Sequence, residues 1–211
     1  MVRREHVVLI HGIWMPGWTM GRLGRSLSAG GYRVHNFTYH SVSKTPEANA
    51  RRLAHFIRGI GVPRVHLVAH SLGGLVVLHL FHLFHDLPAG QVVLLGSPVR
   101  GSGVAKKMSS RPWMAPLLGR SVDSGLLGGA PAWQGGRALG VIVGTRNIGI
   151  GRLIGGLGAR GDGTVAVEET ELSGATDTLC LRVGHTAMLF SSAVAAEVIC
   201  FLRQGHFLKR R

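Results

Sequence analysis

Short apolar runs alternate with helix-like segments along most of this chain, and that alternation limits its fold more than any other feature. The runs fit buried strands because they are brief and rich in branched side chains; they lie at 6–10, 65–69, 92–95, 139–143 and 179–183, and residues 32–38 alternate between apolar and polar side chains like a further strand. Segments with helical periodicity lie at 18–29, 46–60, 73–87 and 186–202. A repeated strand–helix unit implies right-handed crossovers and parallel pairing. We therefore predict an α/β fold, with a mostly parallel sheet of about six strands and helices on both faces.

Two stretches interrupt this alternation. Residues 98–137 place tryptophan, methionine and leucine among glycines and prolines, which predicts an apolar excursion over one end of the sheet. Residues 144–163 are rich in glycine and predict a loop. A chain of 211 residues with 45% apolar content can bury one sizeable core, so residues 1–211 are predicted to form a single domain.

The chain is strongly basic, because 24 Lys and Arg residues against 10 Asp and Glu residues give a net charge of +14. This balance suits an anionic partner, such as a phospholipid surface, nucleic acid or a negatively charged substrate. No nucleic-acid-binding motif accompanies the charge, and the arginines are scattered, so a solvated basic surface is the simpler interpretation. We predict no specific nucleic acid partner and only weak association with an anionic membrane surface.

The cellular compartment is predicted from two features. The first apolar run begins at Val7 and ends before His11, which is too short for the core of a signal peptide or for a membrane span. The only cysteines, Cys180 and Cys200, fall in a predicted strand and a predicted helix and form no disulfide framework. The sequence therefore predicts a cytoplasmic protein in a reducing compartment.

Ser71 stands in the heptapeptide VAHSLGG, at residues 68–74, between a predicted strand and a predicted helix. Hydrolases with a G-x-S-x-G motif carry their nucleophile at such a turn, and the first glycine is here Ala69. One added methyl group is a small steric change, and Gly73 and Gly74 keep the tightest positions. If the heptapeptide stood alone, a serine that only caps the helix would be the better interpretation.

A nucleophilic serine needs a base and an orienting acid, which at such a turn follow in the order serine, acid, histidine. Of the two late histidines, His206 lies in the basic tail, whereas His185 directly follows the last predicted strand and is the better base. Asp162, between glycines in GDGTV, is predicted as the acid, with Glu168 and Glu169 as alternatives. A solvated Asp-Gly turn is the competing interpretation of Asp162.

Backbone N–H groups that receive a developing oxyanion are expected after the nucleophile and after the first strand. They belong to Leu72 and, beyond the dipeptide HG, to Ile13. Trp14 and Trp18, in the stretch WMPGW, are predicted substrate contacts together with the apolar excursion. Either stretch fits a role in the core equally well. The predicted chemistry needs no cofactor.

Three histidines at helical spacing raise the question of a metal site. His79, His82 and His85 form H-x-x-H-x-x-H-D with Asp86. Successive histidines at this spacing drift around a helix and do not converge as the zinc ligands of H-E-x-x-H do. We predict no metal site and a solvent-facing histidine stripe.

Five segments, taken together and in this order, resemble the lipases and esterases of the α/β-hydrolase fold, particularly small bacterial lipases without a large cap. They are LIHGIW at 9–14, VAHSLGG at 68–74, LGSPVRGSG at 95–103, GDGTV at 161–165 and VGHTAMLFSS at 183–192. AHSLGG is similar to the A-x-S-x-G variant among those small lipases. The resemblance implies the α/β-hydrolase fold and these roles: Ser71 nucleophile, Asp162 acid, His185 base, Ile13 and Leu72 oxyanion donors.

Two features depart from that group. Its members are typically secreted, whereas no signal segment is seen here, and the stretch between Gly144 and Asp162 is longer than expected.

The predicted function is a serine hydrolase that cleaves carboxylic esters, of a small molecule or a lipid, through an acyl-enzyme on Ser71. Two alternatives stay open. They are an acyltransferase or thioesterase with the same triad, and a non-catalytic basic module that binds anionic surfaces.

Overall fold

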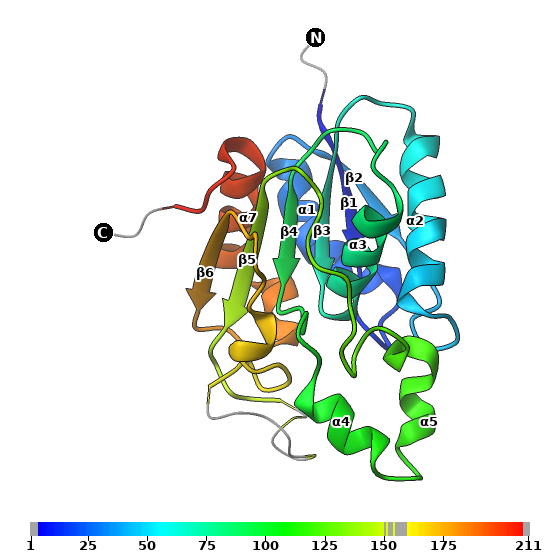
Figure 1. The fold of residues 1–211 in the computed structure, drawn as a ribbon. Coiled ribbons are helices and arrows are strands. Elements are labelled where there is room, and N and C mark those ends of the chain that lie inside the picture. The colour runs from blue at the N-terminus through cyan, green and yellow to red at the C-terminus, as the bar shows by residue number, and fades with distance from the viewer. Residues whose placement is uncertain (1–3, 150, 152–153, 155–159, 209–211) are drawn as a thin grey trace.

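The computed structural model of the chain describes residues 4–149, 151, 154 and 160–208 (Figure 1). In the described residues, six strands form one sheet in the order β2-β1-β3-β4-β5-β6, and every neighbouring pair is parallel. The strands are β1 (His6–Ile10), β2 (Arg33–Phe37), β3 (Val65–His70), β4 (Val92–Leu95), β5 (Leu139–Gly144) and β6 (Asp177–Leu181). This arrangement confirms the α/β fold and the parallel sheet predicted from the apolar runs.

Helices connect and cover these strands. The α-helices are α1 (Gly21–Ala29), α2 (Pro46–Ile60), α3 (Leu72–Leu83), α4 (Gly103–Ser109), α5 (Ala115–Leu118) and α7 (Ser192–Gln204). Short 3₁₀ helices are η1 (Gly17–Met20), η2 (Gly119–Val122), η3 (Glu168–Thr170) and η4 (Thr186–Phe190). No helix in the described part of the chain combines the length and apolar character needed to cross a bilayer.

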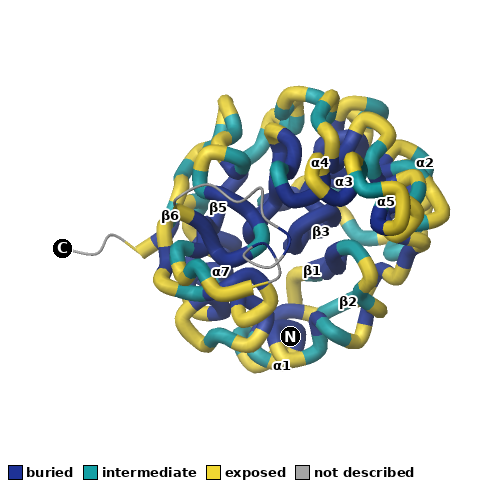
Figure 2. Tube along the Cα trace, turned by 90° about the horizontal axis from the view of Figure 1, so that it is seen from below, coloured by how far each residue is buried: buried dark blue, intermediate teal, exposed yellow. Residues whose placement is uncertain are grey.

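The sheet separates two layers of helices (Figures 1 and 2). Helices α2 and α3 pack on one face and α1 and α7 on the other. Alternate residues of a strand point to opposite faces, so Val8 of β1 packs with the α2–α3 layer and Val7 with the α1–α7 layer. Because both faces are covered, β3, β4 and β5 are buried along their whole length.

The strand order brings the ends of β1 and β3 together. In the register, Ile10 at the end of β1 lies opposite Ala69 of β3, although β2 and α2 separate these strands in the chain. The strand order reverses between β1 and β3, and in open α/β sheets ligands bind at such a reversal, beyond the carboxyl ends of the strands. The HG dipeptide and Ser71 therefore emerge side by side.

Helix boundaries differ from the sequence predictions in three places. The predicted helix at 18–29 begins as η1, and the predicted helix at 73–87 ends at Leu83 because Phe84 takes an extended backbone conformation. The predicted helix at 186–202 divides at Ser191, whose hydroxyl accepts a hydrogen bond from the Val194 N–H at 3.3 Å and starts α7 anew. The stretch predicted as an excursion contains α4, α5 and η2.

Candidate active site

Ser71 occupies the sharp turn between β3 and α3. Its backbone has φ 54° and ψ −123°, a conformation that residues other than glycine rarely adopt. The turn is held by the Ser71 N–H, which donates to the Leu95 carbonyl at 2.9 Å, and by the Gly74 N–H, which donates to the Ser71 carbonyl at 3.0 Å. Ser71 thus sits at the carboxyl edge of the sheet with the strained backbone expected of a nucleophile elbow.

Small residues make this turn possible. A Cβ atom at Gly73 would lie 2.7 Å from the Ile10 carbonyl oxygen, and one at Gly74 would overlap the Ser97 hydroxyl. Ala69, two residues before the serine, is fully buried and packs in the core below α2 and α3. The core has room for the methyl group that distinguishes VAHSLGG from a motif beginning with glycine.

Asp162 and His185 form a close buried pair beside this turn. The His185 Nδ1–H donates to Asp162 Oδ2 at 2.6 Å, and the His185 backbone N–H donates to the Asp162 carbonyl at 2.9 Å. This arrangement leaves the other ring nitrogen, Nε2, as a proton acceptor. Gly96, with φ 53°, makes the approach possible, because a Cβ there would lie 2.8 Å from Asp162 Oδ2.

The alternative acids have other partners. Glu169 accepts hydrogen bonds from the Gly103 N–H at 2.6 Å and the Ala166 N–H at 3.0 Å, and its burial raises its pKa. Glu168 is exposed on η3. Within the described residues, neither carboxylate bonds to His185. The alternative base, His206, lies beyond α7, where its ring bonds to the neighbouring Phe207 carbonyl at 3.0 Å.

Ser71 and His185 line the same open cleft, which has a volume of about 440 Å³. The lining also includes Ile13, Trp14, Met15, His70, Ile148, Gly149, Thr164, Gly184, Thr186 and Ala187. Both side chains of the pair that would exchange a proton are more than nine-tenths buried. The cleft is where a substrate carbonyl can reach the Ser71 hydroxyl.

The predicted oxyanion donors flank Ser71. Leu72 opens α3, where the first N–H groups of a helix lack an intrahelical acceptor, and Ile13 lines the cleft. The loop that carries Ile13 is held by His11, whose ring stacks on Tyr39 with centroids 4.3 Å apart. The Tyr39 hydroxyl donates to the His11 carbonyl at 2.8 Å, and burial lowers the pKa of His11, which keeps this ring neutral.

Comparison with known protein families places the chain in one of them. The sequence matches the alpha/beta hydrolase family over residues 7–180. The chain belongs to the alpha/beta hydrolase family. No curated protein sequence matches the chain significantly.

Solved structures share the α/β-hydrolase fold at low sequence identity. The mature form of the Bacillus licheniformis lipase BlEst2 is 19% identical with a TM-score of 0.74, over 97% of this chain and 93% of that one. Phospholipase PlaB from Legionella pneumophila is 16% identical with a TM-score of 0.72, over 96% of this chain but 60% of that one. A thermophilic esterase from Thermogutta terrifontis is 17% identical with a TM-score of 0.67, over 96% and 90%.

His70 is a site residue that the sequence reasoning missed. Its side chain is buried, its Nε2–H donates to the His185 carbonyl at 3.1 Å, and the two imidazole rings lie 4.6 Å apart. Burial and the neighbouring His185 ring hold the pKa of His70 well below its usual value. His70 therefore stays neutral beneath His185 and supports its loop. Its place beside Ser71 in the motif was the only available signal.

An apolar slot opens on the other side of Ser71. It has a volume of about 40 Å³ and shares Ile13, Trp14, Ser71 and Thr164 with the open cleft. Its apolar wall comes mainly from the excursion and consists of Pro98, Val104, Ala105, Met108, Leu118, Leu126 and Val165. Ser71 lies where the slot and the cleft meet.

The two predicted substrate contacts lie in different surroundings. Trp14 lines both the cleft and the slot; its indole N–H donates to the Leu117 carbonyl at 2.7 Å, and its backbone has φ 57°. Trp18, 78% exposed on η1, is not among the described residues that line either hollow. The structure therefore brings Trp14, and not Trp18, to Ser71.

The histidine stripe on α3 is not wholly exposed. His79 is buried, and its Nε2–H donates to the Ser124 carbonyl at 2.7 Å, so the prediction of a solvent-facing stripe is wrong for this residue. The excursion covers His79, whereas His82 and His85 face solvent. Among the described residues, no cluster of three or more His, Cys, Asp or Glu side chains could hold a metal ion.

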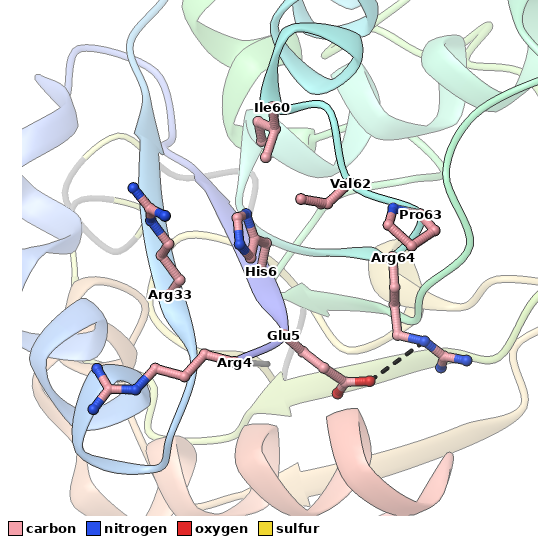
Figure 3. A pocket seen from close by; sticks show the side chains of 8 residues that line it. All are labelled: Arg4, Glu5, His6, Arg33, Ile60, Val62, Pro63 and Arg64. Carbon is pink, nitrogen blue, oxygen red and sulfur yellow. Dashed lines mark ion pairs between the residues drawn. The ribbon is translucent and has the colours of Figure 1, made fainter. Parts of the chain in front are cut away.

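A wider hollow lies at the opposite end of the sheet, near the start of β1 (Figure 3). It is lined by Arg4, Glu5, His6, Arg33, Ile60, Val62, Pro63 and Arg64, and the Glu5 carboxylate pairs with Arg64 at 3.3 Å. Glu5 also accepts a hydrogen bond from buried His66 at 3.2 Å. None of the predicted site residues lines this hollow, so size alone does not identify the active site.

Proposed function

We propose that this α/β hydrolase is a serine hydrolase that cleaves carboxylic esters through an acyl-enzyme on Ser71. The observation that carries the proposal is the buried Asp162–His185 hydrogen bond, which orients His185 at the wall of a cleft that also exposes Ser71. The solved neighbours include proteins named as a lipase, a phospholipase and an esterase, which agrees with ester chemistry.

The proposed reaction begins with attack of Ser71 Oγ on the ester carbonyl carbon, while His185 Nε2 takes the hydroxyl proton. The Ile13 and Leu72 N–H groups receive the resulting oxyanion, and Asp162 stays ionised and stabilises the imidazolium. The tetrahedral intermediate then expels the alcohol, which takes the proton from His185. Water attacks the acyl-enzyme, its proton passes to His185, and the carboxylic acid leaves as Ser71 regains its proton.

The two hollows at Ser71 suggest which of them binds the acyl group of the ester and which binds the alcohol. The apolar slot suits the acyl group, because Val104, Met108 and Leu126 offer it only hydrocarbon and sulfur contacts. Its volume of about 40 Å³ is far smaller than the volume of about 440 Å³ of the open cleft. The open cleft of about 440 Å³ beside His185 suits the alcohol. The proposed substrates are therefore esters of short acyl groups with larger alcohols.

Hydrolysis of p-nitrophenyl acetate and butyrate by the full chain tests the proposal. We expect turnover that falls to background in Ser71→Ala and His185→Ala, and a fluorophosphonate that adds covalently to Ser71, seen by peptide mass spectrometry. Ser28→Ala, which removes an exposed hydroxyl from α1, is the matched control and is expected to keep full activity. Equal hydrolysis by parent and Ser71→Ala, or labelling elsewhere, contradicts the proposal. A rate that rises with added alcohol or thiol acceptor indicates acyl transfer instead.

A further inference from the structure

Large apolar side chains are exposed at one end of this molecule. Among the described residues, seven of the eight exposed large hydrophobic residues lie in segments that follow the carboxyl ends of strands. They are Trp14, Trp18, Trp113, Leu117, Leu127, Ile148 and Phe190; the eighth is Leu208, beyond α7. Exposed apolar side chains gathered at one end of a protein mark a surface that meets an apolar partner.

The α4–α5 segment projects furthest at this end. In Figure 1 both helices and their connection lie beyond the tips of the strand arrows, and Figure 2 shows exposed residues along α4 and α5. Trp113, in the connection, is 72% exposed, and Leu117 on α5 is 50% exposed. Their neighbours Met114 and Leu118 are buried, so the segment is anchored while its outer side chains face solvent.

The charge of this segment is entirely positive. Residues 98–122 contain no Asp or Glu and include Arg100, Lys106, Lys107, Arg111 and Arg120. Arg100 and Arg120 pair with Glu171 and Asp123. Lys106 and Lys107 are exposed on α4, and no ion pair is found for them within the described residues.

We propose that Lys106, Lys107, Trp113 and Leu117 form a docking face for an anionic phospholipid bilayer. Tryptophan and leucine gain by insertion at the boundary between headgroups and acyl chains, and neighbouring lysines attract anionic headgroups. A second copy of this chain is a poor occupant, because two chains of charge +14 repel each other. Nucleic acid is a poorer match, because aliphatic Leu117 gains nothing from base stacking.

The docking face adjoins the open cleft. The Leu117 carbonyl accepts the Trp14 indole N–H at 2.7 Å, and Trp14 and exposed Ile148 line the cleft. A docked bilayer therefore lies at the cleft that leads to Ser71. Membrane binding itself does not depend on catalysis, but one consequence rests on the proposed function. The natural ester then joins a short acyl group, which fits the slot, to an amphiphilic alcohol held in the membrane.

Vesicle sedimentation with the Ser71→Ala chain tests docking without turnover. We expect binding to vesicles of phosphatidylglycerol and phosphatidylcholine, little binding to phosphatidylcholine alone, and weaker binding as salt rises. Lys106→Gln with Lys107→Gln is expected to weaken binding about 30-fold, since each lysine near the surface contributes about fivefold. Trp113→Ser is expected to weaken it about tenfold.

Matched variants test whether vesicle binding depends on this face or on the overall positive charge of the chain. Arg25→Gln with Arg52→Gln removes two exposed charges from α1 and α2, and Leu208→Ser removes an exposed leucine beyond α7; both are expected to change binding by about twofold or less. Equal losses in the two charge variants, or unchanged binding by Trp113→Ser, overturn the docking face. A single-stranded oligonucleotide is added as a competitor for the vesicles. If it displaces the chain from them and its own binding requires Trp113, the face binds nucleic acid, and the proposal of a membrane-docking face is overturned as well.

Hydrolysis of an ester held in the membrane is measured separately, with the parent chain and hexadecyl butyrate in the same two vesicle types. We expect faster hydrolysis in the anionic vesicles, and loss of that advantage in Lys106→Gln with Lys107→Gln, while hydrolysis of soluble p-nitrophenyl butyrate is unchanged. Vesicle binding without any ester hydrolysis contradicts the proposed function and leaves docking intact. Hydrolysis without vesicle binding contradicts docking alone.

Discussion

Asp162 divides its two carboxylate oxygens between His185 and its own loop. Oδ2 accepts the His185 Nδ1–H at 2.6 Å, and Oδ1 accepts the backbone N–H groups of Thr164 at 2.9 Å and Val165 at 2.8 Å. The second set of bonds fixes the carboxylate, so the imidazole is oriented by a group that cannot rotate away from it. A solvated Asp-Gly turn is incompatible with this burial, because Asp162 is 1% exposed.

Asp162→Asn is expected to lower kcat for p-nitrophenyl butyrate by about 10⁴-fold, because an amide favours the wrong tautomer of the imidazole. KM is expected to change little. Glu168→Gln, on the exposed residue of η3, is the control and is expected to retain parental kcat. Steady-state kinetics with circular dichroism to verify folding decides the outcome. If Asp162→Asn retains activity and Glu168→Gln loses it, then Glu168, and not Asp162, is the acid.

Met108→Ala is expected to lengthen the acyl group that the protein accepts. The side chain of Met108 forms part of the wall of the apolar slot, and its removal adds room for about two or three methylene groups. The ratio of kcat/KM for hexanoate to that for acetate is expected to rise about 15- to 60-fold, since each of two or three buried methylene groups contributes about 0.8 kcal/mol. A series of p-nitrophenyl esters from acetate to octanoate measures this ratio.

Ala187→Gly is the comparison for this change, because Ala187 lines the open cleft instead of the slot. It is expected to leave the preference for acyl length as in the parent. An unchanged preference in Met108→Ala, or an equal shift in both variants, places the acyl group outside the slot.

His70→Gln is expected to reduce the loss of stability in acid. The pKa of His70 in the folded chain lies well below the unfolded value of about 6.5, so the unfolded chain binds this proton first. The stability that the neutral ring provides is present above about pH 6.5 and is lost as pH falls toward the folded pKa, by up to about 1.4 kcal/mol per pH unit. Glutamine keeps an N–H donor for the His185 carbonyl but does not titrate.

Urea unfolding of parent and His70→Gln at several values between pH 5 and 7 measures this slope. The variant is expected to have a shallower slope by about one proton. Some slope remains, because burial also lowers the pKa values of His11 and His66. Identical slopes in the two chains mean that folding does not lower the pKa of His70.

Gly73→Ala and Gly59→Ala are expected to have opposite effects on stability. A methyl group at Gly73 meets the Ile10 and His11 carbonyl oxygens at 2.7 and 2.8 Å, whereas one at Gly59 of α2 meets nothing within 4 Å. Thermal unfolding is expected to show a loss of about 1–3 kcal/mol for Gly73→Ala. Gly59→Ala is expected to gain about 0.5–1 kcal/mol, because alanine favours a helix. Similar Tm values for both variants refute this steric account of the turn.

The sheet could be predicted because its signal is local. Val92 to Leu95 is an uninterrupted apolar run and Val65 to Ala69 is interrupted only by His66, and covered parallel strands are rich in such runs. The strained serine was also predictable, since its turn joins a buried strand to a helix with two glycines, Gly73 and Gly74, in its first turn. Both inferences use neighbours in the chain.

The environment of several histidines depends on partners far away in the chain. His79 is buried because the carbonyl of Ser124, 45 residues later, accepts its hydrogen bond. His70 lies under His185 because of the fold, and the two residues are 115 positions apart in a sequence that carries no pattern indicating the contact. Trp18 was expected near the substrate from its proximity to Trp14 in sequence, but η1 turns it outward.

One hydrogen bond spans 103 residues to join the loop of the predicted oxyanion donor to the wall of the slot. The Trp14 indole holds the Leu117 carbonyl of α5, and Trp14 itself directly follows Ile13. A displacement of α5 away from the sheet must therefore either break this bond or drag the Ile13 N–H with it. While this bond is intact, opening of the slot wall through α5 also moves the predicted oxyanion donor, so under the proposed function the access of the acyl group and the stabilisation of the oxyanion are coupled through Trp14.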